Sequence, residues 1–355
     1  MTRLFVNMRY NGILAIESLI SFAFAVRNRN KIINAYKSIN VSELHMPLLI
    51  IAPHPDDEWL SSAGLINEIS KVGKSLGVNV IVMSNGEAFL KIDKKWKKQS
   101  NIPLWAERQL ETRSGLRFLT GEPIEPIFVG FSDGKISEPF ISKDISTIVA
   151  NYNLLRNLIL EKGYKTIIFP HFSDDHPDHW GTSILTLLVL YSLSMETPSK
   201  VDENTYLMYL THFDNFPIRG NSRKLSIIPP SSMCDSYCQE VHLSDNSYRL
   251  KKTALKFFKS QNVDLGNALM LRNFIKRNEL FYKLHCEVNL DLHTMIPTTK
   301  KDYNGKLVTW NFIFSKEGML KYVNFDKEYR SSDNYVSTTF ANYGNYFRVY
   351  NIKIR

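Results

Sequence analysis

The sequence predicts an α/β fold, with a Rossmann-like, mostly parallel sheet that is flanked by helices. From residue 46 onward, short apolar runs alternate with longer stretches of helical periodicity. This alternation is typical of parallel sheets that carry helices on both faces. Four of the apolar runs end directly in polar clusters. Ligands of such sheets bind beyond the carboxyl ends of the strands, so we expect these clusters to meet in one site.

The apolar runs and the periodic stretches between them give the order of the expected elements. Strands are predicted at residues 47–52, 78–83, 126–129, 166–169 and 205–213. Helices are predicted at residues 61–74, 105–118, 145–162, 180–192, 245–261 and 273–284. After residue 285 the chain becomes rich in Thr, Tyr, Asn, Phe and Val, with short alternations at 307–314 and 346–354. This pattern predicts a small β-rich appendage.

We expect three parts: an N-terminal helical extension (residues 1–45), the α/β domain (46–285) and the β-rich region (286–355). Within the extension, Glu17, Ser18 and Ser21 fall on one helical face and apolar side chains fall on another. This predicts an amphipathic helix that packs on the body or lies on a membrane. The apolar run at 13–26 is too short to span a bilayer. A cleaved signal peptide is the less favoured alternative, because Ala-Phe-Ala at 23–25 resembles a cleavage site.

Composition limits the class of protein. The 355 residues include 44 Lys and Arg against 35 Asp and Glu, a net charge of +9, which favours acidic partners. No nucleic-acid-binding motif accompanies this charge, so no nucleic-acid partner is expected. The three cysteines, Cys234, Cys238 and Cys286, do not form a disulfide framework. A reducing compartment is the simpler interpretation, and we expect a cytoplasmic protein with membrane association as an open alternative.

The first polar cluster, His54-Pro55-Asp56-Asp57-Glu58, directly follows the first predicted strand. A strand that ends in His-x-x-Asp can present an imidazole and a carboxylate to one metal ion, and zinc accepts both. The intervening Asp56 would lie beside the metal without binding it, where a general base for hydrolysis belongs. The alternative is an ordinary helix N-terminus, since acidic residues are common in the first turn.

The second cluster, His176-Pro177-Asp178-His179, follows the fourth predicted strand. One of its imidazoles can complete a set of three ligands, and the other can donate a hydrogen bond to an oxyanion. The residues alone leave open which of the two imidazoles binds the metal and which donates the hydrogen bond. The alternative is a polar loop ahead of a helix that Asp178 caps.

Together the two clusters resemble the signatures A-H-P-D-D-E and H-P-D-H of the PIG-L/LmbE-like family of zinc-dependent N-acetylglucosaminyl deacetylases. Pro53 replaces the alanine of the first signature, and the second is intact. Weaker matches follow in the family's order, and the resemblance spans residues 47–284. They are Ser84-Asn85-Gly86-Glu87, Arg108-Gln109-Leu110-Glu111, Phe131-Ser132-Asp133-Gly134, Asp174, Ser260-Gln261 and Glu279-Leu280-Phe281.

The resemblance implies a role for each matching residue. His54, Asp57 and His179 would bind one Zn²⁺ per chain, with another divalent transition metal as the alternative. Asp56 would be the general base, and His176 would polarise the acetyl carbonyl.

Four further residues receive supporting roles from the resemblance. Arg108 and Asp133 would contact the sugar. The alternatives are an exposed ion pair between Arg108 and Glu111, and a plain turn aspartate. Glu58 and Asp174 would hold the metal ligands in position without binding the metal themselves.

The expected function is hydrolysis of the N-acetyl group of a GlcNAc-type amino sugar in a glycoconjugate or polysaccharide precursor, with release of acetate. Two alternatives are open: a deacylase for a different N-acyl group, and a non-catalytic carbohydrate- or membrane-binding protein on the same scaffold. The partner is then an N-acetylated sugar. The candidate segments for peripheral membrane contact are the N-terminal helix and the segment from Lys91 to Lys98. The sequence predicts no oligomeric state.

Overall fold

The computed structural model describes most of the chain from Lys37 to Ile352. The described residues are 37–88, 90–142, 144–196, 204–213, 216–217, 226–230, 238–284, 296–297, 308–315, 320–325, 335–343 and 346–352. Most of the predicted N-terminal extension lies outside them, as do Cys234 and Cys286. Cys238 is buried and forms no disulfide within the described part of the chain. Within these ranges, no helix has the length and apolar character that crossing a membrane requires.

The main body is built on an eight-stranded sheet with the order β1-β7-β8-β6-β5-β2-β3-β4. Most neighbouring strands run parallel, and only the β6–β8 and β7–β8 pairs among the described strands are antiparallel. The predicted mostly parallel α/β sheet is confirmed. Its strands are β1 (Lys37–Ser38), β2 (Leu48–Ala52), β3 (Val78–Ser84), β4 (Ile127–Phe131), β5 (Thr166–Pro170), β6 (Thr205–Tyr209), β7 (Cys238–His242) and β8 (Asn278–Leu284).

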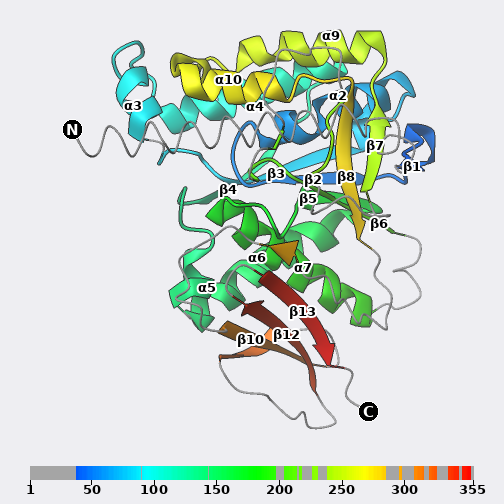
Figure 1. The fold of residues 1–355 in the computed structure, drawn as a ribbon, viewed down its shortest axis with the longest axis vertical. Coiled ribbons are helices and arrows are strands. Elements are labelled where there is room, and N and C mark those ends of the chain that lie inside the picture. Colours follow the sequence, from blue (N-terminus) through cyan, green and yellow to red (C-terminus); the bar gives the residue numbers. More distant parts are fainter. Residues whose placement is uncertain are drawn as a thin grey trace.

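Helices cover both faces of this sheet (Figure 1). One face carries α2 (Asp57–Lys71), α4 (Leu104–Thr120), α9 (Asp245–Ala254) and α10 (Leu265–Asn273), with α3 (Leu90–Trp96) at its edge. The other carries α5 (Glu138–Ser142), α6 (Ile145–Lys162) and α7 (Pro177–Glu196). The 3₁₀ helices are η1 (Val41–Glu43), η2 (Ser75–Gly77), η4 (Leu255–Phe257) and η5 (Ser260–Val263).

Local sequence explains where these elements begin and end. All five residues of β2 are buried, as expected for a parallel strand covered on both faces. Helix α6 has the predicted bounds, because Asp144 accepts a hydrogen bond from the Thr147 N–H at its start and Gly163 takes a left-handed conformation at its end. Helix α2 starts at Asp57, four residues before the predicted start, so the first polar cluster forms its first turn.

The helix predicted at residues 273–284 is wrong. Helix α10 ends at Asn273, and residues 278–284 form β8, which pairs with both β6 and β7. Short buried apolar segments carry no clear periodicity, so sheet pairing decided the structure here. Strand β7 was not predicted. The helix predicted at 245–261 ends at Ala254 and is followed by η4 and η5.

A second, antiparallel sheet lies in the predicted β-rich region. Its strand order is β11-β10-β12-β13-β9. The strands are β9 (Ile296–Pro297), β10 (Val308–Ser315), β11 (Leu320–Phe325), β12 (Tyr335–Tyr343) and β13 (Tyr346–Ile352). Strands β10 and β13 coincide closely with the predicted alternations. The division of the chain into three parts stays a prediction.

A buried ion pair fixes α2 against β8 and α9. The Lys251 Nζ lies 2.6 Å from Glu279 Oε1 and also donates to the Leu60 carbonyl at 3.0 Å. The Glu279 carboxylate accepts the backbone N–H groups of Gly64 and Leu65, both at 2.8 Å. In an undisturbed helix, the Leu60 carbonyl would accept from the Gly64 N–H. Lys251 and Glu279 therefore bind main-chain carbonyl and N–H groups in the middle of α2, the helix that carries Asp57.

We expect removal of one partner to destabilise the protein strongly. Glu279→Ala leaves the Lys251 ammonium and two N–H groups buried without their acceptor, which should cost about 3–5 kcal/mol of unfolding free energy. Urea denaturation measures this loss. The exposed pair Arg113–Glu125 provides the control, because Glu125→Ala should cost about 1 kcal/mol or less. Equal losses in the two variants would contradict the structural role of the buried pair.

Candidate active site and metal centre

The site begins at the carboxyl end of β2, where the backbone takes an unusual conformation. Asp56 has φ 128° and ψ −23°. Among the described residues it is the only non-glycine residue with a positive φ. A side-chain-bearing residue adopts such a conformation at a cost of about 1–3 kcal/mol, which surrounding contacts must offset. The Glu58 Oε2 supplies one of these contacts by accepting the Asp56 N–H at 3.0 Å. Strain of this kind is concentrated at functional sites, which agrees with the role predicted for Asp56; that role stays a prediction.

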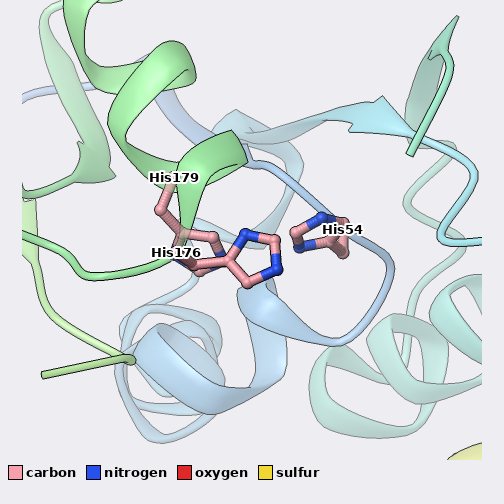
Figure 2. Close-up of side chains that lie close together, drawn as sticks. All are labelled: His54, His176 and His179. Carbon is pink, nitrogen blue, oxygen red and sulfur yellow. The ribbon is translucent and has the colours of Figure 1, made fainter. Parts of the chain in front are cut away.

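The three predicted metal ligands lie together and are buried. Asp57 Oδ2 lies 3.2 Å from His54 Nδ1 and 3.1 Å from His179 Nε2. His179 is fully buried, and its Nε2 has no hydrogen-bond partner. Figure 2 shows the rings of His54, His176 and His179 facing one another. Two strand ends, those of β2 and β5, thus bring both sequence clusters into one site, as predicted.

Each predicted ligand also belongs to a set of three side chains whose donor atoms all lie within 4.8 Å of one another. The sets are His54, His176 and His179; Asp57, His179 and His212; and His54, Asp133 and Asp178. Imidazole nitrogens and carboxylate oxygens of this kind are the ligands that zinc and related divalent metals take.

Electrostatics of the cluster favour a positive charge at its centre. Burial alone would lower the pKa of His179, but Asp174 and Asp57 raise it to about 9. Burial likewise opposes protonation of His54, but hydrogen bonds with Asp133, Asp178 and Asp57 raise its pKa well above the usual value. The pKa of Asp57 is lowered, because His179 and His54 outweigh its burial. A divalent cation would supply the charge that these carboxylates stabilise, so the residues fit a metal ion.

Two carboxylates hold the His54 ring from the side opposite Asp57. His54 Nε2 lies 3.1 Å from Asp133 Oδ1 and 3.3 Å from Asp178 Oδ2. The other His54 nitrogen, Nδ1, is thereby directed toward Asp57. Carboxylates behind metal-binding imidazoles commonly fix their orientation in this way. The pKa of Asp133 is lowered, because its contacts with His54 outweigh its burial.

The approach of α7 to the loop after β4 places Asp178. Its carboxylate accepts the N–H groups of Gly134 at 2.6 Å and Ile136 at 3.1 Å. A Cβ at Gly181 would lie 2.8 Å from the Ser137 nitrogen, so only glycine allows this approach. Asp178 therefore binds backbone N–H groups of the loop after β4 and also contacts His54, whereas the sequence suggested only that it caps a helix.

Asp174 organises the second cluster. Its Oδ2 accepts the N–H groups of Thr211 and His212, at 2.9 and 3.0 Å. The same oxygen lies 3.3 Å from His179 Nδ1, and Thr211 Oγ1 lies 2.9 Å from that nitrogen. The opposite nitrogen of His179 is thereby turned toward Asp57. This position agrees with the supporting role predicted for Asp174, which stays a prediction.

Arg108 is buried against the candidate base. Its Nη2 lies 3.1 Å from Asp56 Oδ2, and its guanidinium donates to the Pro55 and Gly86 carbonyls, both at 2.6 Å. Burial raises the pKa of Asp56 to about 6, and the positive charge of Arg108 opposes this rise. The predicted sugar contacts of Arg108 and Asp133 stay predictions, and the structure adds contacts of both residues within the site.

Glu111 does not form the exposed ion pair with Arg108 that the sequence left open. It is buried, and its carboxylate accepts the N–H and Oγ–H of Ser260 at 2.6 and 2.7 Å. Two of the weaker sequence matches thus contact each other. Burial also raises the pKa of Glu58 to about 8.

Sequence reasoning gave too little weight to two histidines. His212 lies with its ring centroid 4.9 Å from that of His179 and 5.2 Å from that of His176, so it lines the site. His171, in the polar segment after the predicted strand 166–169, is buried and stacks on Phe172. The sequence offered only one signal for His212, its position near the end of the predicted strand 205–213, and histidines packed in a core occupy such positions as well.

Known proteins share parts of the sequence and fold of this chain. Residues 49–190 match the family model described as PIG-L: GlcNAc-PI de-N-acetylase. No curated protein matches the chain. The fold and the buried His/Asp cluster define an α/β protein with a candidate metal site. More specifically, residues 49–190 are similar to the PIG-L family model, and the resemblance noted in the sequence is confirmed over these residues. The activity named in the description of this family model, de-N-acetylation, is the hydrolysis of an amide.

Several solved structures are similar to the chain. A conserved protein from Thermus thermophilus has 19% identity and a TM-score of 0.42, with 67% of this chain and 94% of that chain covered. N,N′-diacetylchitobiose deacetylase from Pyrococcus horikoshii has 18% identity and a TM-score of 0.45, with 69% and 88% covered. An A40926 pseudoaglycone deacetylase has 18% identity and a TM-score of 0.45, with 66% and 96% covered.

The contact between Arg108 and the loop after β3 requires glycine at position 86. Gly86 has φ +66°, and a Cβ there would lie 2.1 Å from Arg108 Nη1. Gly121 has a similar φ of +75° but no atom near its Cβ position. We expect Gly86→Ala and Gly121→Ala each to lose about 1–2 kcal/mol of unfolding free energy from the left-handed backbone.

Only Gly86→Ala should also displace Arg108 from Asp56. Its turnover of an accepted substrate should fall at least about tenfold, in line with loss of a group that positions the candidate base. Gly121→Ala should keep the wild-type rate. Denaturation and steady-state kinetics on the two variants measure both effects, and equal rates would show that the Arg108 position does not matter for turnover.

Proposed function

We propose that the protein is a metal-dependent hydrolase that removes the N-acetyl group from a GlcNAc-type amino sugar. The sugar would belong to a glycoconjugate or polysaccharide precursor, and the products would be acetate and the free amine. The match of residues 49–190 to the de-N-acetylase family model supports this reaction. The cytoplasmic location expected from the sequence stays a prediction.

One observation carries the proposal: the position and conformation of Asp56. Its carboxylate is buried beside the His/Asp cluster, and its backbone is held in a strained conformation by contacts with Glu58 and α4. A carboxylate that only capped a helix would need neither the strain nor the buried Arg108. A general base in a hydrolase needs both a fixed position and a pKa near neutrality.

The proposed ligands of the metal are His54, Asp57 and His179. The buried Nε2 of His179, which has no hydrogen-bond partner but lies 3.1 Å from Asp57 Oδ2, supports this set, as does the position of that oxygen between the two imidazoles. A divalent cation held there supplies Lewis-acid chemistry, which polarises a carbonyl oxygen and lowers the pKa of water. We propose one zinc ion per chain, with another divalent transition metal as the alternative.

Asp56 would take a proton from the attacking water as the water oxygen bonds to the acetyl carbon. As the C–N bond breaks, the proton would pass from Asp56 to the nitrogen of the leaving amine, so the base is restored. His176 would stabilise the oxyanion. Burial and the nearby cationic imidazoles lower its pKa, so the ring is neutral. Its Nδ1 accepts the Asp178 N–H at 3.3 Å, which leaves the Nε2–H free to donate to an oxyanion.

Separate variants distinguish the proposed base from a proposed ligand. Asp56→Ala should keep the bound metal and lose at least about 10²-fold in turnover, because general-base catalysis typically contributes that much or more. His179→Ala should lose the metal. Elemental analysis of the purified variants measures metal content, and the assay below measures turnover. Metal retention and activity in both variants would refute the assignment of roles.

The pH profile tests the electrostatic link between Arg108 and Asp56. Turnover should fall as the pH drops through the pKa of Asp56, because only the ionised carboxylate accepts a proton. Arg108→Met removes the positive charge that lowers this pKa, so the acidic limb of the kcat/KM profile should move to higher pH by about 1–3 units. Arg108→Lys retains the charge and should shift the limb less. Identical acidic limbs in the wild type and in Arg108→Met would show that Arg108 does not set the pKa of the candidate base Asp56.

A substrate screen tests the reaction itself. N-acetylated hexosamines, chitooligosaccharides and sugar nucleotides are incubated with the full-length protein, and free amine and acetate are measured with added zinc and with a chelator. Metal-dependent release of both products in equal amounts supports the proposal. Release of a different acyl group identifies the protein as another deacylase. Absence of metal binding together with absence of release from all donors would favour a non-catalytic binding protein.

A further inference from the structure

A small hydrophobic cluster, separate from the main core, joins three segments at one corner of the body. Ile92, Trp96 and Leu104 are buried together, with Val263 packed against them. The Trp96 indole N–H donates to the Ile102 carbonyl at 2.9 Å. Figure 1 shows α3 at the edge of the helical layer, beside α10 and α4.

An ion pair between α3 and the start of α10 completes this corner. Lys95 Nζ lies 2.7 Å from Asp264 Oδ2, and Asp264 caps α10 by accepting the Asn267 N–H. We call the assembled residues 90–98, 102–105 and 263–269 the α3 corner. Because its segments are held by a common cluster and an ion pair, the side chains on its outer side have fixed positions.

The outer side of the α3 corner carries large exposed apolar side chains. Leu265 is 70% exposed and Leu269 51%, and the two lie one turn apart on the same face of α10. Trp105 is 46% exposed and Ile102 is 44% exposed. Single exposed apolar residues are ordinary, but several gathered in one place indicate an interaction surface.

The α3 corner also carries positive charge. Lys94, Lys97 and Lys98 of the α3 corner are exposed. Residues 90–120 and 245–273, which span α3, α4, α9 and α10 but not α2 of this helical layer, contain 14 Lys and Arg but only five Asp and Glu, a net charge of +9. That value equals the net charge of the whole chain, so the rest of the sequence is neutral on balance. An anionic partner is therefore favoured on this layer.

We propose that the α3 corner docks on an anionic lipid surface. Leucine and tryptophan side chains enter the boundary between headgroups and acyl chains, while flanking lysines attract anionic headgroups. A nucleic acid would use the lysines and Trp105, but the aliphatic Leu265 and Leu269 would add nothing to contacts with phosphates. A lipid interface uses both kinds of side chain.

The structure changes which aromatic residue serves this contact. The sequence placed Trp96 among the residues that could meet a headgroup. Trp96 is only 7% exposed and its N–H is engaged, so Trp105 takes that place. Trp105 lies one helical turn before Arg108, which contacts Asp56. Docking would thus bring the candidate site near the lipid surface, although the docking itself does not rest on the proposed hydrolysis.

Vesicle flotation with the full-length protein tests the proposal. The probes are vesicles of pure phosphatidylcholine and of phosphatidylcholine with about one-third phosphatidylglycerol. The test variants are Leu265→Ser/Leu269→Ser and Lys94→Gln/Lys97→Gln/Lys98→Gln. The matched control is Leu154→Ser/Leu160→Ser, which removes two similarly exposed leucines from α6 on the opposite face of the sheet. Far-ultraviolet circular dichroism verifies that each variant is folded.

We expect the wild type and the control to bind anionic vesicles and to bind neutral vesicles weakly. Each test variant should lose at least about tenfold in affinity, since one lysine near an anionic surface is worth about a factor of five. Activity on a soluble substrate should be unchanged in all variants, which separates this proposal from that of the hydrolase. Wild-type vesicle binding by both test variants, or binding of duplex DNA without binding of vesicles, would overturn the proposal.

Discussion

The site depends on one carboxylate oxygen, Asp57 Oδ2, which lies within 3.2 Å of two buried imidazole nitrogens. A buried carboxylate between two imidazoles is stable only if positive charge accompanies it. The protein raises the pKa of both His54 and His179, and a divalent cation would satisfy the same requirement with three directed bonds. Asp133, Asp174 and Asp178 behind the two rings add further negative charge and fix the ring orientations.

The sheet makes this concentration of charge possible. The carboxyl ends of the adjacent strands β2 and β5 present the two polar clusters, and α2 and α7 start there. The buried Lys251–Glu279 pair then fixes α2 from its other side. Asp56 lies where strand, turn and helix meet, and Glu58 and Arg108 hold it in its strained conformation. The stability of the helical layer and the position of the candidate base are therefore linked.

Much of this arrangement could be predicted from local sequence patterns. Strand β2 is a continuous apolar run, β3 is apolar apart from Asn79 and its last residue Ser84, and His54 and His176 lie in the polar clusters after predicted strands. The structure of β8 could not be predicted, because residues 278–284 become a strand only by pairing with β6 and β7. The burial of Arg108 and Glu111 and the place of His212 depend on contacts between segments far apart in the chain. Local periodicity does not encode such contacts.

The most direct test of the metal centre is X-ray absorption spectroscopy at the zinc edge on the purified, zinc-loaded protein. The proposed metal site requires one zinc per chain with only nitrogen and oxygen ligands, at about 2.0–2.2 Å. It also predicts the outer-shell scattering of two imidazole rings, and loss of one ring's contribution in His54→Ala. A spectrum with sulfur ligands, or with only water and carboxylate oxygens and no imidazole scattering, would contradict a site made by His54, Asp57 and His179.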